Sequence, residues 1–435
     1  MTSRPQVVIV GGGFGGLAAA RALGSAPVDV ILLDRSNHHL FQPLLYQVAT
    51  SELTPAHIAS PIRNILRKQR NTSVILSEVT GIDKVGRRVF AKNVDREGVA
   101  VPYDYLVLAT GAHHSYFGHD EFAQFAPGLK TAADAVMLRN RILQAFERAE
   151  ALDDPKQPDG LLTFVLVGAG PTGVEMAGAI AVLIRQSLRT EFRRIDPASA
   201  RIVLVEGGGR VLGSFSESLS LAAKKRLESL GVEVRDGHVD RIDAEGAWIG
   251  TERIPSKTVI WAAGVVAAAP VGKWLEVEAD RAGRIRIDGL CRVPGCPGVF
   301  AIGDAASLDQ DGHTLPGVAQ VAMQQGHYIG RYIAGMTTGV TTEPPPFRYF
   351  DKGNMAVVGK GFAVMESGKF KLSGYLAWMA WLVIHVSFLA QFSLRLTVFR
   401  QWMWTYLTGQ RGSRLIVNHH AQPENRENES PTSTQ

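Results

Sequence analysis

An α/β fold with two similar nucleotide-binding halves is predicted by three repeated features of the sequence. An apolar run, a G-x-G-x-x-G loop and an alanine-rich stretch occur in this order at residues 7–20 and again at 164–181. Each copy is followed by a second apolar run that ends in an acid, and each closes on an apolar run and a glycine. Strand, glycine loop and helix in this order are typical of a dinucleotide-binding βαβ unit. The 435 residues suffice for two such domains and a further segment.

The two glycine loops have their glycines at equivalent positions, namely Gly11, Gly13 and Gly16 in the first and Gly168, Gly170 and Gly173 in the second. The first glycine of such a loop permits a tight turn, the second lets the backbone approach a pyrophosphate, and the third lets the helix pack closely on the strand. A single loop of this kind also occurs as a plain surface turn. Two in the same setting predict two bound dinucleotides, which is the simplest design for an electron-transfer enzyme.

The acids that end the second apolar runs are Asp34 and Glu206. A carboxylate at this strand tip accepts hydrogen bonds from the adenosine ribose and disfavours a 2′-phosphate. Glu206 therefore favours NADH over NADPH, although Arg210 nearby has the chemistry to hold a 2′-phosphate. Glu206 follows its glycine loop at a longer interval than Asp34 does, which predicts a long helix over residues 174–192. The repeat closes at Gly111 in the first copy and at Gly264 in the second.

The C-terminal part is basic, apolar and rich in tryptophan. No Asp or Glu occurs from residue 367 to 422, and residues 372–394 contain no charged side chain. This composition favours an anionic lipid surface over nucleic acid as the partner. Trp378, Trp381 and His385 fall at helical spacing, which favours amphipathic helices lying in the membrane surface. A membrane-spanning helix and a packed helix at a dimer interface are the alternatives.

Two further features concern the ends of the chain and its cysteines. The chain passes from Met1 almost directly into a strand, so we expect no signal peptide. Cys291 and Cys296 cannot form a disulfide framework by their number, and we interpret them as ordinary thiols in a loop. We expect no metal site.

Several segments together resemble the type II NADH dehydrogenases, the single-subunit NADH:quinone oxidoreductases among the two-domain flavoproteins. Besides the glycine loops, they are residues 41–50 (FQPLLYQVAT), Thr110-Gly111, the Gly303-Asp304 pair, residues 319–326 (AQVAMQQG) and Asp351-Lys352-Gly353. The AQVAMQQG motif is the most specific of these, because neighbouring flavoprotein families lack it. Disulfide reductases carry a cysteine pair beside the flavin, which this chain lacks.

The resemblance implies two Rossmann-like domains, of which the NADH domain is inserted in the FAD domain, and a C-terminal membrane-associating helical segment. The implied ranges are an FAD domain at 1–112 and 269–340, an NADH domain at 113–268, a membrane-anchoring region at 341–420 and a disordered tail at 421–435. Residues 153–160 are polar and rich in turn formers, and we interpret them as a connection. Removal of everything after Lys371 is expected to release a flavoprotein that still oxidises NADH.

The resemblance also implies the site residues. The residues implied to bind FAD are Gly11, Gly13, Phe14, Gly15, Gly16, Asp34, Gln42, Pro43, Thr110, Gly111, Asp304, Ala319 and Gln320. The residues implied to bind NADH, the substrate, are Gly168, Gly170, Thr172, Gly173, Glu206 and Gly264.

Four residues are implied to act on the substrates: Glu175, Gln320, Gln324 and Lys352. Glu175, which we place in the first turn of the helix after the NADH loop, would lie near the nicotinamide and the quinone path. An acid there also stabilises a helix with no catalytic role. Gln320 and Gln324, one turn apart on one face, would donate to quinone oxygens, although such a pair is commonly a solvated face. Lys352 would neutralise a developing quinol anion, or be a plain surface lysine.

The implied activity is transfer of hydride from NADH to FAD and of two electrons to a membrane quinone, ubiquinone or menaquinone, without proton pumping. The implied location is the cytoplasmic side of the cell membrane, as a peripheral homodimer. Two other classes remain open. A soluble flavin reductase would show no quinone activity, and a non-catalytic NAD(H) sensor would bind FAD with negligible turnover.

Overall fold

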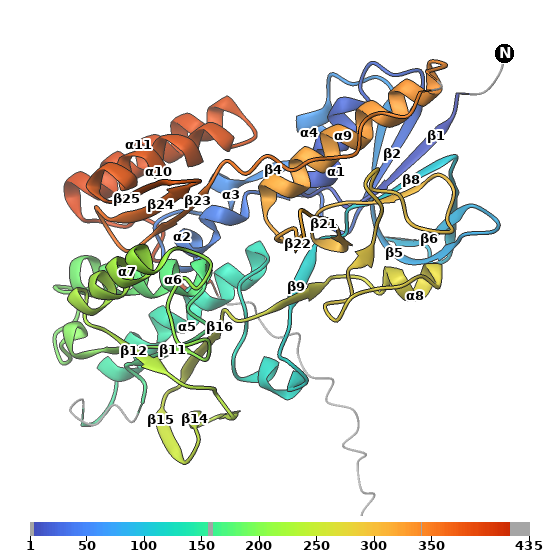
Figure 1. The fold of residues 1–435 in the computed structure, drawn as a ribbon. Helices are drawn as coiled ribbons and strands as arrows, with labels where there is room; N and C mark the ends of the chain where they lie inside the picture. Colours follow the sequence, from blue (N-terminus) through green and yellow to red (C-terminus); the bar gives the residue numbers. More distant parts are fainter. Residues whose placement is uncertain (1–3, 155–159, 341, 418–435) are drawn as a thin grey trace, which may run out of the picture.

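The computed structural model describes residues 4–154, 160–340 and 342–417 (Figure 1). The first glycine loop follows the carboxyl end of an interior strand in a seven-stranded sheet. Five neighbouring strands are parallel, and two antiparallel strands extend the sheet at one side. In spatial order the strands are β19 Val299–Ala301, β8 Tyr105–Leu108, β1 Gln6–Val10, β2 Asp29–Asp34, β5 Thr72–Asp83, β6 Arg88–Asn93 and β7 Val99–Pro102. Because β19 pairs with β8, the chain returns to the first sheet after completing the second.

The second glycine loop belongs to a separate, fully parallel sheet of four strands. They are β12 Val232–Asp236, β11 Arg201–Glu206, β10 Thr163–Val167 and β16 Thr258–Trp261. A three-stranded antiparallel sheet adjoins it, made of β13 Arg241–Asp243, β14 Gly246–Ile249 and β15 Glu252–Pro255. The antiparallel pair β9 Ala112–His114 and β17 Val265–Ala267 joins the two units. Each of these strands directly follows a closing glycine, Gly111 or Gly264.

Small residues set the distance between the two helices that cover the first sheet, α1 Phe14–Ala22 and α9 Ala319–Thr337. A Cβ placed on Gly326 would lie 2.2 Å from the Gly15 carbonyl oxygen, and one on Gly330 would lie 2.5 Å from the Ala22 Cβ. The backbones therefore meet without side chains between them. This contact brings the start of α9, which carries Gln320 and Gln324, to the first glycine loop.

The remaining elements surround these units. The other helices are α2 Leu45–Ala49, α3 Pro55–Ile58, α4 Ile62–Leu66, α5 Ala132–Glu150, α6 Pro171–Val182, α7 Glu217–Ser229, α8 Val271–Leu275, α10 Tyr375–Phe388 and α11 Phe392–Thr408. The other strands are β3 His38–Leu40, β4 Ala59–Pro61, β18 Ile285–Arg286, β20 Ala306–Ser307, β21 Asp309–Gln310, β22 His313–Thr314, β23 Asn354–Val357, β24 Ala363–Ser367 and β25 Phe370–Gly374. Short 3₁₀ turns occur at Gln42–Leu44, Asp120–Gln124, Pro197–Ser199 and Gly303–Ala305.

The helix predicted over residues 174–192 is shorter in the structure. α6 ends at Val182 and continues as one π-helical turn, Leu183–Ser187, after which the chain is irregular. The C-terminal segment crosses at this point, because the Ser187 hydroxyl donates to the Gly409 carbonyl at 3.0 Å and Arg414 donates to the Ser187 carbonyl at 3.4 Å. The hydroxyl and the carbonyl of Ser187, where the helical turn ends, are thus both bound by another part of the chain.

The C-terminal region is part of the core and not an appendage. A single hydrophobic cluster contains side chains of residues 41–58, of the second sheet and of α10 and α11. Trp378, Trp381 and Trp402 are buried in it, so the predicted tryptophan stripe faces the protein and only Trp404 is exposed. This packing argues against the expectation that residues after Lys371 can be removed without damage. The charge-free run 372–394 is divided among β25, α10 and the start of α11.

Some predictions concern residues outside the described part of the chain. The tail at 421–435 lies wholly outside it, and so do residues 155–159 of the connection. Among the described residues, no helix combines the length and the hydropathy that a membrane span requires.

Candidate functional site

The two glycine loops have the same geometry. Gly11 and Gly168 have φ of +104° and +100°, a region that L-residues with side chains avoid. A Cβ on Gly16 would lie 1.8 Å from the Gly11 carbonyl oxygen, and the corresponding distance from Gly173 to Gly168 is also 1.8 Å. The first and third glycines of each loop are therefore obligatory for its shape.

The two strand-tip acids also correspond. Asp34 accepts from the Gly12 N–H at 2.5 Å and from the Ser36 N–H at 2.6 Å. Glu206 accepts from the Ala169 N–H and the Gly208 N–H, both at 2.6 Å. Each acid thus fixes the middle of its own glycine loop, and burial raises the pKa of Asp34 while these N–H groups lower it.

The loops have room for a ligand on their outer side. No atom lies within 4 Å of a Cβ placed on Gly13 or Gly170, the residues that precede α1 and α6. The first N–H groups of both helices are unsatisfied within the helix and suit phosphate oxygens. At the first loop, the hydroxyl of Thr110 and the Gln320 Oε1 atom are buried without a partner among the described residues. Orphaned polar atoms of this kind indicate a polar ligand, so the first site fits a flavin dinucleotide.

The other residues predicted for FAD lie around the first loop. Phe14, the first residue of α1, makes edge contacts with the rings of His39 and Phe41. Gln42 donates to the Lys130 carbonyl at 3.4 Å, and Pro43 follows it in a 3₁₀ turn. Gly111 follows β8 with φ of +71°, and Ala319 begins α9.

Asp304 lies in the turn that returns to the first unit. The Gly303 N–H donates to the buried Oε1 of Gln325 at 2.7 Å, which fixes this turn to α9. Burial raises the pKa of Asp304, whereas the positive charges of Lys130 and Arg284 lower it. Gln325 and Lys130 were not predicted from the sequence. Gln325 lies within the AQVAMQQG motif, which was the available signal, but nothing local marked Lys130.

Gln320 and Gln324 bind the loop that carries Lys352, through contacts that the sequence did not indicate. The Gln320 amide donates to the Gly353 carbonyl at 3.0 Å, and the Gln324 amide donates to the Phe350 carbonyl at 2.9 Å and accepts from its N–H at 3.0 Å. Both side chains therefore hold the loop that carries the exposed Lys352. The orphaned Gln320 Oε1 is left to accept a further hydrogen bond.

Glu175 lies in the second turn of α6, because the helix begins at Pro171; the prediction of a first-turn acid was wrong. The effect of the helix dipole has faded at that position. Burial instead raises the pKa of Glu175 to about 8, opposed by the Val357 N–H, which donates to its carboxyl at 3.4 Å. Glu175 is thus a carboxyl group that carries a proton near neutral pH, as general acids do.

Strand β23 connects the two candidate groups. It begins after Gly353, which Gln320 holds, and ends at Val357, which binds Glu175. At the usual rise per residue, these two contacts are separated by about 13 Å.

The residues predicted for NADH surround the second loop. Thr172 is exposed at the start of α6, and Gly264 follows β16 with φ of +66°. The ring of Phe117 lies so close to Gly264 that a Cβ there would be 2.4 Å from it. Arg210 donates to the carbonyls of Gly213 and Phe215 at 2.6 and 3.1 Å, so its guanidinium is bound within its own loop.

A buried polar cluster beside Glu175 was not predicted. Trp402 of α11 donates to Gln47 Oε1 at 2.8 Å, and Gln47 in turn donates to the Tyr46 hydroxyl at 3.2 Å. Arg411 donates to the Thr50 carbonyl at 2.6 Å and lies 3.9 Å from the Glu52 carboxylate. Arg411 was predicted as part of a basic, lipid-facing segment, and its burial corrects that interpretation. Arg414 is likewise engaged, in an ion pair with Glu191 at 2.7 Å.

Cys291 and Cys296 are free, buried and in a loop, as predicted. Burial raises the pKa of both thiols, which keeps them protonated and unreactive.

Comparison with known proteins assigns the chain to a family. The family model of pyridine nucleotide-disulphide oxidoreductases matches residues 5–326. The type II NADH:quinone oxidoreductase Ndh of Mycobacterium tuberculosis is 45% identical over 429 residues, which cover 96% of this chain and 91% of that protein. The chain belongs to the type II NADH:quinone oxidoreductases. NdhA of the same organism, also named a type II NADH:quinone oxidoreductase, is 44% identical over 95% of this chain and 90% of its own.

Solved structures with a similar fold include a member of this family. NDH2 from Plasmodium falciparum in complex with NADH matches with a TM-score of 0.85 and 20% identity, over 95% of this chain and 100% of that one. The sulfide:quinone oxidoreductase of Aquifex aeolicus matches less well, with a TM-score of 0.68 and 17% identity, over 90% and 91% of the two chains. The type II family fold of two dinucleotide-binding domains and C-terminal helices is therefore that of this chain.

Proposed function

We propose that this protein oxidises NADH with a quinone by means of bound FAD. The observation that carries the proposal is β23, which ties Gln320, next to the first glycine loop, to Glu175, on the helix of the second loop. FAD, when bound, supplies the chemistry of accepting hydride from NADH and passing two electrons to quinone. The first loop with Asp34, Thr110, Asp304 and Gln320 supports FAD binding, and the second loop with Glu206 supports NADH.

The roles of the polar side chains follow from their contacts. Gln320 and Gln324 position the loop that carries Lys352, and Gln320 Oε1 accepts from a ligand. Lys352, held at the edge of the same site, provides positive charge for a reduced quinone. Glu175, protonated near neutral pH, donates a proton to a quinone oxygen.

The test is an NADH:quinone assay on the FAD-loaded protein, with NADPH as the control nucleotide. We expect NADH-dependent quinone reduction in the wild type and a decrease of at least about 10-fold in Glu175→Gln, because general acids commonly contribute more than this. FAD absorbance should be unchanged in the variant. Wild-type turnover in Glu175→Gln would exclude the proton-donor role.

We also propose that the exposed apolar side chains of α10 and α11 dock the protein on a lipid surface. We call this set the apolar face: Leu376, Met379, Val383, Phe388, Phe392, Leu396, Phe399, Met403, Trp404 and Leu407, all at least 40% exposed. Contiguous exposed apolar surface on neighbouring helices marks a membrane or protein contact. Exposed Lys369 and Arg400 favour an anionic surface.

Lipid is the favoured occupant because a quinone substrate partitions into membranes. A homodimer and a location on the cytoplasmic side accompany this proposal. Vesicle flotation separates lipid docking from self-association, since a dimer formed through the apolar face would remain unbound to vesicles. Mass photometry in detergent and without it gives the number of copies.

A further inference from the structure

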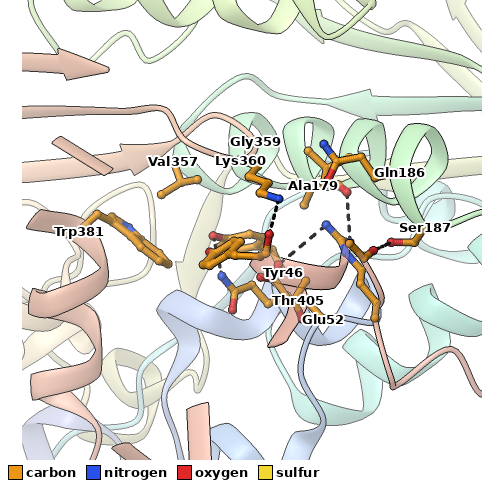
Figure 2. Close-up of a pocket in the computed structure, with 15 residues that line it drawn as sticks. Tyr46, Glu52, Ala179, Gln186, Ser187, Val357, Gly359, Lys360, Trp381 and Thr405 are labelled. Carbon is orange, nitrogen blue, oxygen red and sulfur yellow. Dashed lines mark hydrogen bonds and ion pairs between the residues drawn. The ribbon is translucent and has the colours of Figure 1, made fainter. Parts of the chain in front are cut away.

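A small cavity lies between both nucleotide-binding units and the C-terminal helices (Figure 2). Its volume is about 30 Å³, room for a water molecule or two. Its lining includes Tyr46 and Glu52 from the segment around α2, Gln186 from the π-helical turn, Val357 from β23, and Thr405 and Arg411 from the C-terminal part.

The cavity is lined by one exposed residue, Gln186, and by a direct neighbour of Glu175, Val357. Gln186 at one end is exposed, whereas Tyr46 is 4% exposed. Val357, whose N–H donates to the Glu175 carboxyl, forms part of the same wall. A proton that enters beside Gln186 therefore has a short polar route toward Glu175.

The walls offer partners to water. Thr405 Oγ1 and Arg411 Nε are buried without a hydrogen-bond partner among the described residues. The Glu52 carboxylate and the Tyr46 hydroxyl add acceptors and a donor. A polar cavity of this size with several free partners meets the conditions for ordered water.

The orientation of the Tyr46 hydroxyl is set by the C-terminal helix. Because Trp402 donates to Gln47 Oε1, the Gln47 amide nitrogen is the atom that faces Tyr46, and it donates to the hydroxyl oxygen. The hydroxyl hydrogen is consequently directed to another acceptor. Burial raises the pKa of Tyr46, the charges that Glu175 and Glu52 carry when ionised raise it further, and the hydroxyl stays protonated.

The reaction needs a proton from outside. NADH delivers two electrons and one proton as hydride, whereas reduction of a quinone to a quinol consumes two electrons and two protons. One proton per turnover must therefore come from solvent, and the buried carboxyl of Glu175 must receive it through the protein.

We propose that this cavity is the proton entry of the enzyme and that Tyr46 relays the proton from cavity water to Glu175. Once Glu175 has given its proton to a quinone oxygen, the Tyr46 hydroxyl gives its own proton to the Glu175 carboxylate and receives one from cavity water, which takes up a proton from bulk solvent in turn. The relay rests on the proposed function, and in particular on the role of Glu175.

Other charged groups around the cavity influence its pH dependence. Burial raises the pKa of Glu52, and the positive charges of Arg411 and Lys360 lower it by a smaller amount. Lys360 donates to the Tyr406 carbonyl at 3.0 Å, and burial raises the pKa of Tyr406. Glu52 and Arg411 therefore determine the electrostatic potential along the route, and Tyr46 and Tyr406 stay protonated.

The experiment is stopped-flow mixing of the reduced, FAD-loaded full-length protein with a short-chain quinone, in H₂O and D₂O, from pH 6 to 9. The variants are Tyr46→Phe and Thr405→Val, which keep the side-chain shapes and remove one hydroxyl each. Tyr328→Phe is the matched control, since its hydroxyl donates to the Pro345 carbonyl outside the cavity. Flavin reduction by NADH takes no proton from this route, so its rate reports damage to the cofactor site.

We expect flavin reoxidation to slow at least about 10-fold in Tyr46→Phe, to a smaller extent in Thr405→Val, and not in Tyr328→Phe. The solvent isotope effect should grow in the first two variants.

The relay is overturned if Tyr46→Phe and Thr405→Val keep the wild-type rate and isotope effect. It is also overturned if reoxidation slows with an unchanged solvent isotope effect, or if flavin reduction slows equally, because Tyr46 then has only a structural role. A wild-type protein whose flavin is not reoxidised by quinone would overturn the proposed function itself, and the relay with it.

Discussion

The position of Glu175 could be read from the sequence, but the burial that determines its protonation could not. Its position after the second glycine loop was visible, but its protonation depends on burial and on Val357, 182 residues away in the chain. The same holds for Arg411, whose charge suggested a lipid contact and whose side chain is buried against Glu52. Residue type and spacing indicate candidates, whereas packing decides their charge state.

The raised pKa of Glu175 makes a prediction about stability. Because burial raises the folded-state pKa to about 8 from the ordinary 4.5, ionisation of Glu175 opposes folding progressively as the pH rises through this interval. Glu175→Gln has no carboxyl group to ionise. The difference between its Tm and the wild-type Tm should therefore increase in favour of the variant as the pH rises from 5 to 8. Thermal unfolding across this range measures the difference, with the exposed Glu217→Gln as the control. A constant difference would show that Glu175 is not buried as described.

Glu206 makes a prediction about nucleotide choice. Its carboxylate fixes the second glycine loop, and Arg210 is bound within its own loop and so is not free for a 2′-phosphate. We expect Glu206→Gln to lower kcat/KM for NADH and to reduce the preference over NADPH by about 10-fold, the effect of one charged hydrogen bond. Glu233→Gln, on the neighbouring strand and paired with Arg201, is the control. An unchanged NADH to NADPH ratio would contradict the role of Glu206.

At the scale of elements, the strand–loop–helix units were predictable because their glycines are dictated by backbone geometry alone. Gly11 and Gly168 need positive φ, and any sequence that forms this loop must supply glycine there. The end of this helix was not predictable, because Gly409 and Arg414, which bind the π-helical turn after α6, are far away in the sequence. Local rules thus defined where the helix starts, and a distant segment defined where it ends.

The contact between α1 and α9 gives a prediction for packing. Gly326→Ala would place a methyl group 2.2 Å from the Gly15 carbonyl oxygen, so the helices must separate. We expect a loss of stability of about 1–3 kcal/mol and weaker FAD retention, measured by Tm and by flavin release. Gly335→Ala in the same helix is the control: its nearest neighbour would be 3.7 Å away, and it should stabilise by about 0.5–1 kcal/mol. Equal effects of the two substitutions would show that the helices do not depend on this contact.

For the whole molecule, the sequence predicted two nucleotide-binding units and a lipid-associated C-terminal region, but not how firmly the last is joined to the others. Trp381 and Trp402 are fully buried against both units. Aromatic periodicity alone could not show which side of α10 faces the protein, because both sides of this helix are apolar. On α10 the exposed side carries Leu376, Met379, Val383 and Phe388, whereas Trp378 and Trp381 face the protein.

The apolar face makes the prediction at this scale. Leu396→Asp combined with Phe399→Asp should abolish most binding to anionic lipid vesicles, because each change replaces a favourable apolar contact by a charge. Flotation measures the bound fraction, and NADH oxidation with a water-soluble acceptor should persist. Leu221→Asp, an equally drastic change at an exposed position of α7, should leave vesicle binding intact. Retained binding in the double variant would place the lipid contact elsewhere.

The last described residues have a practical consequence for anyone who attaches this enzyme to a support. After α11 the chain turns back, and Val417 exchanges two hydrogen bonds with the Asn140 side chain on α5, at 2.7 and 3.2 Å. A linker added beyond this point departs from beside α5 and not from the apolar face. An affinity tag or an electrode tether fused directly after Val417 should therefore leave the side chains of α10 and α11 accessible.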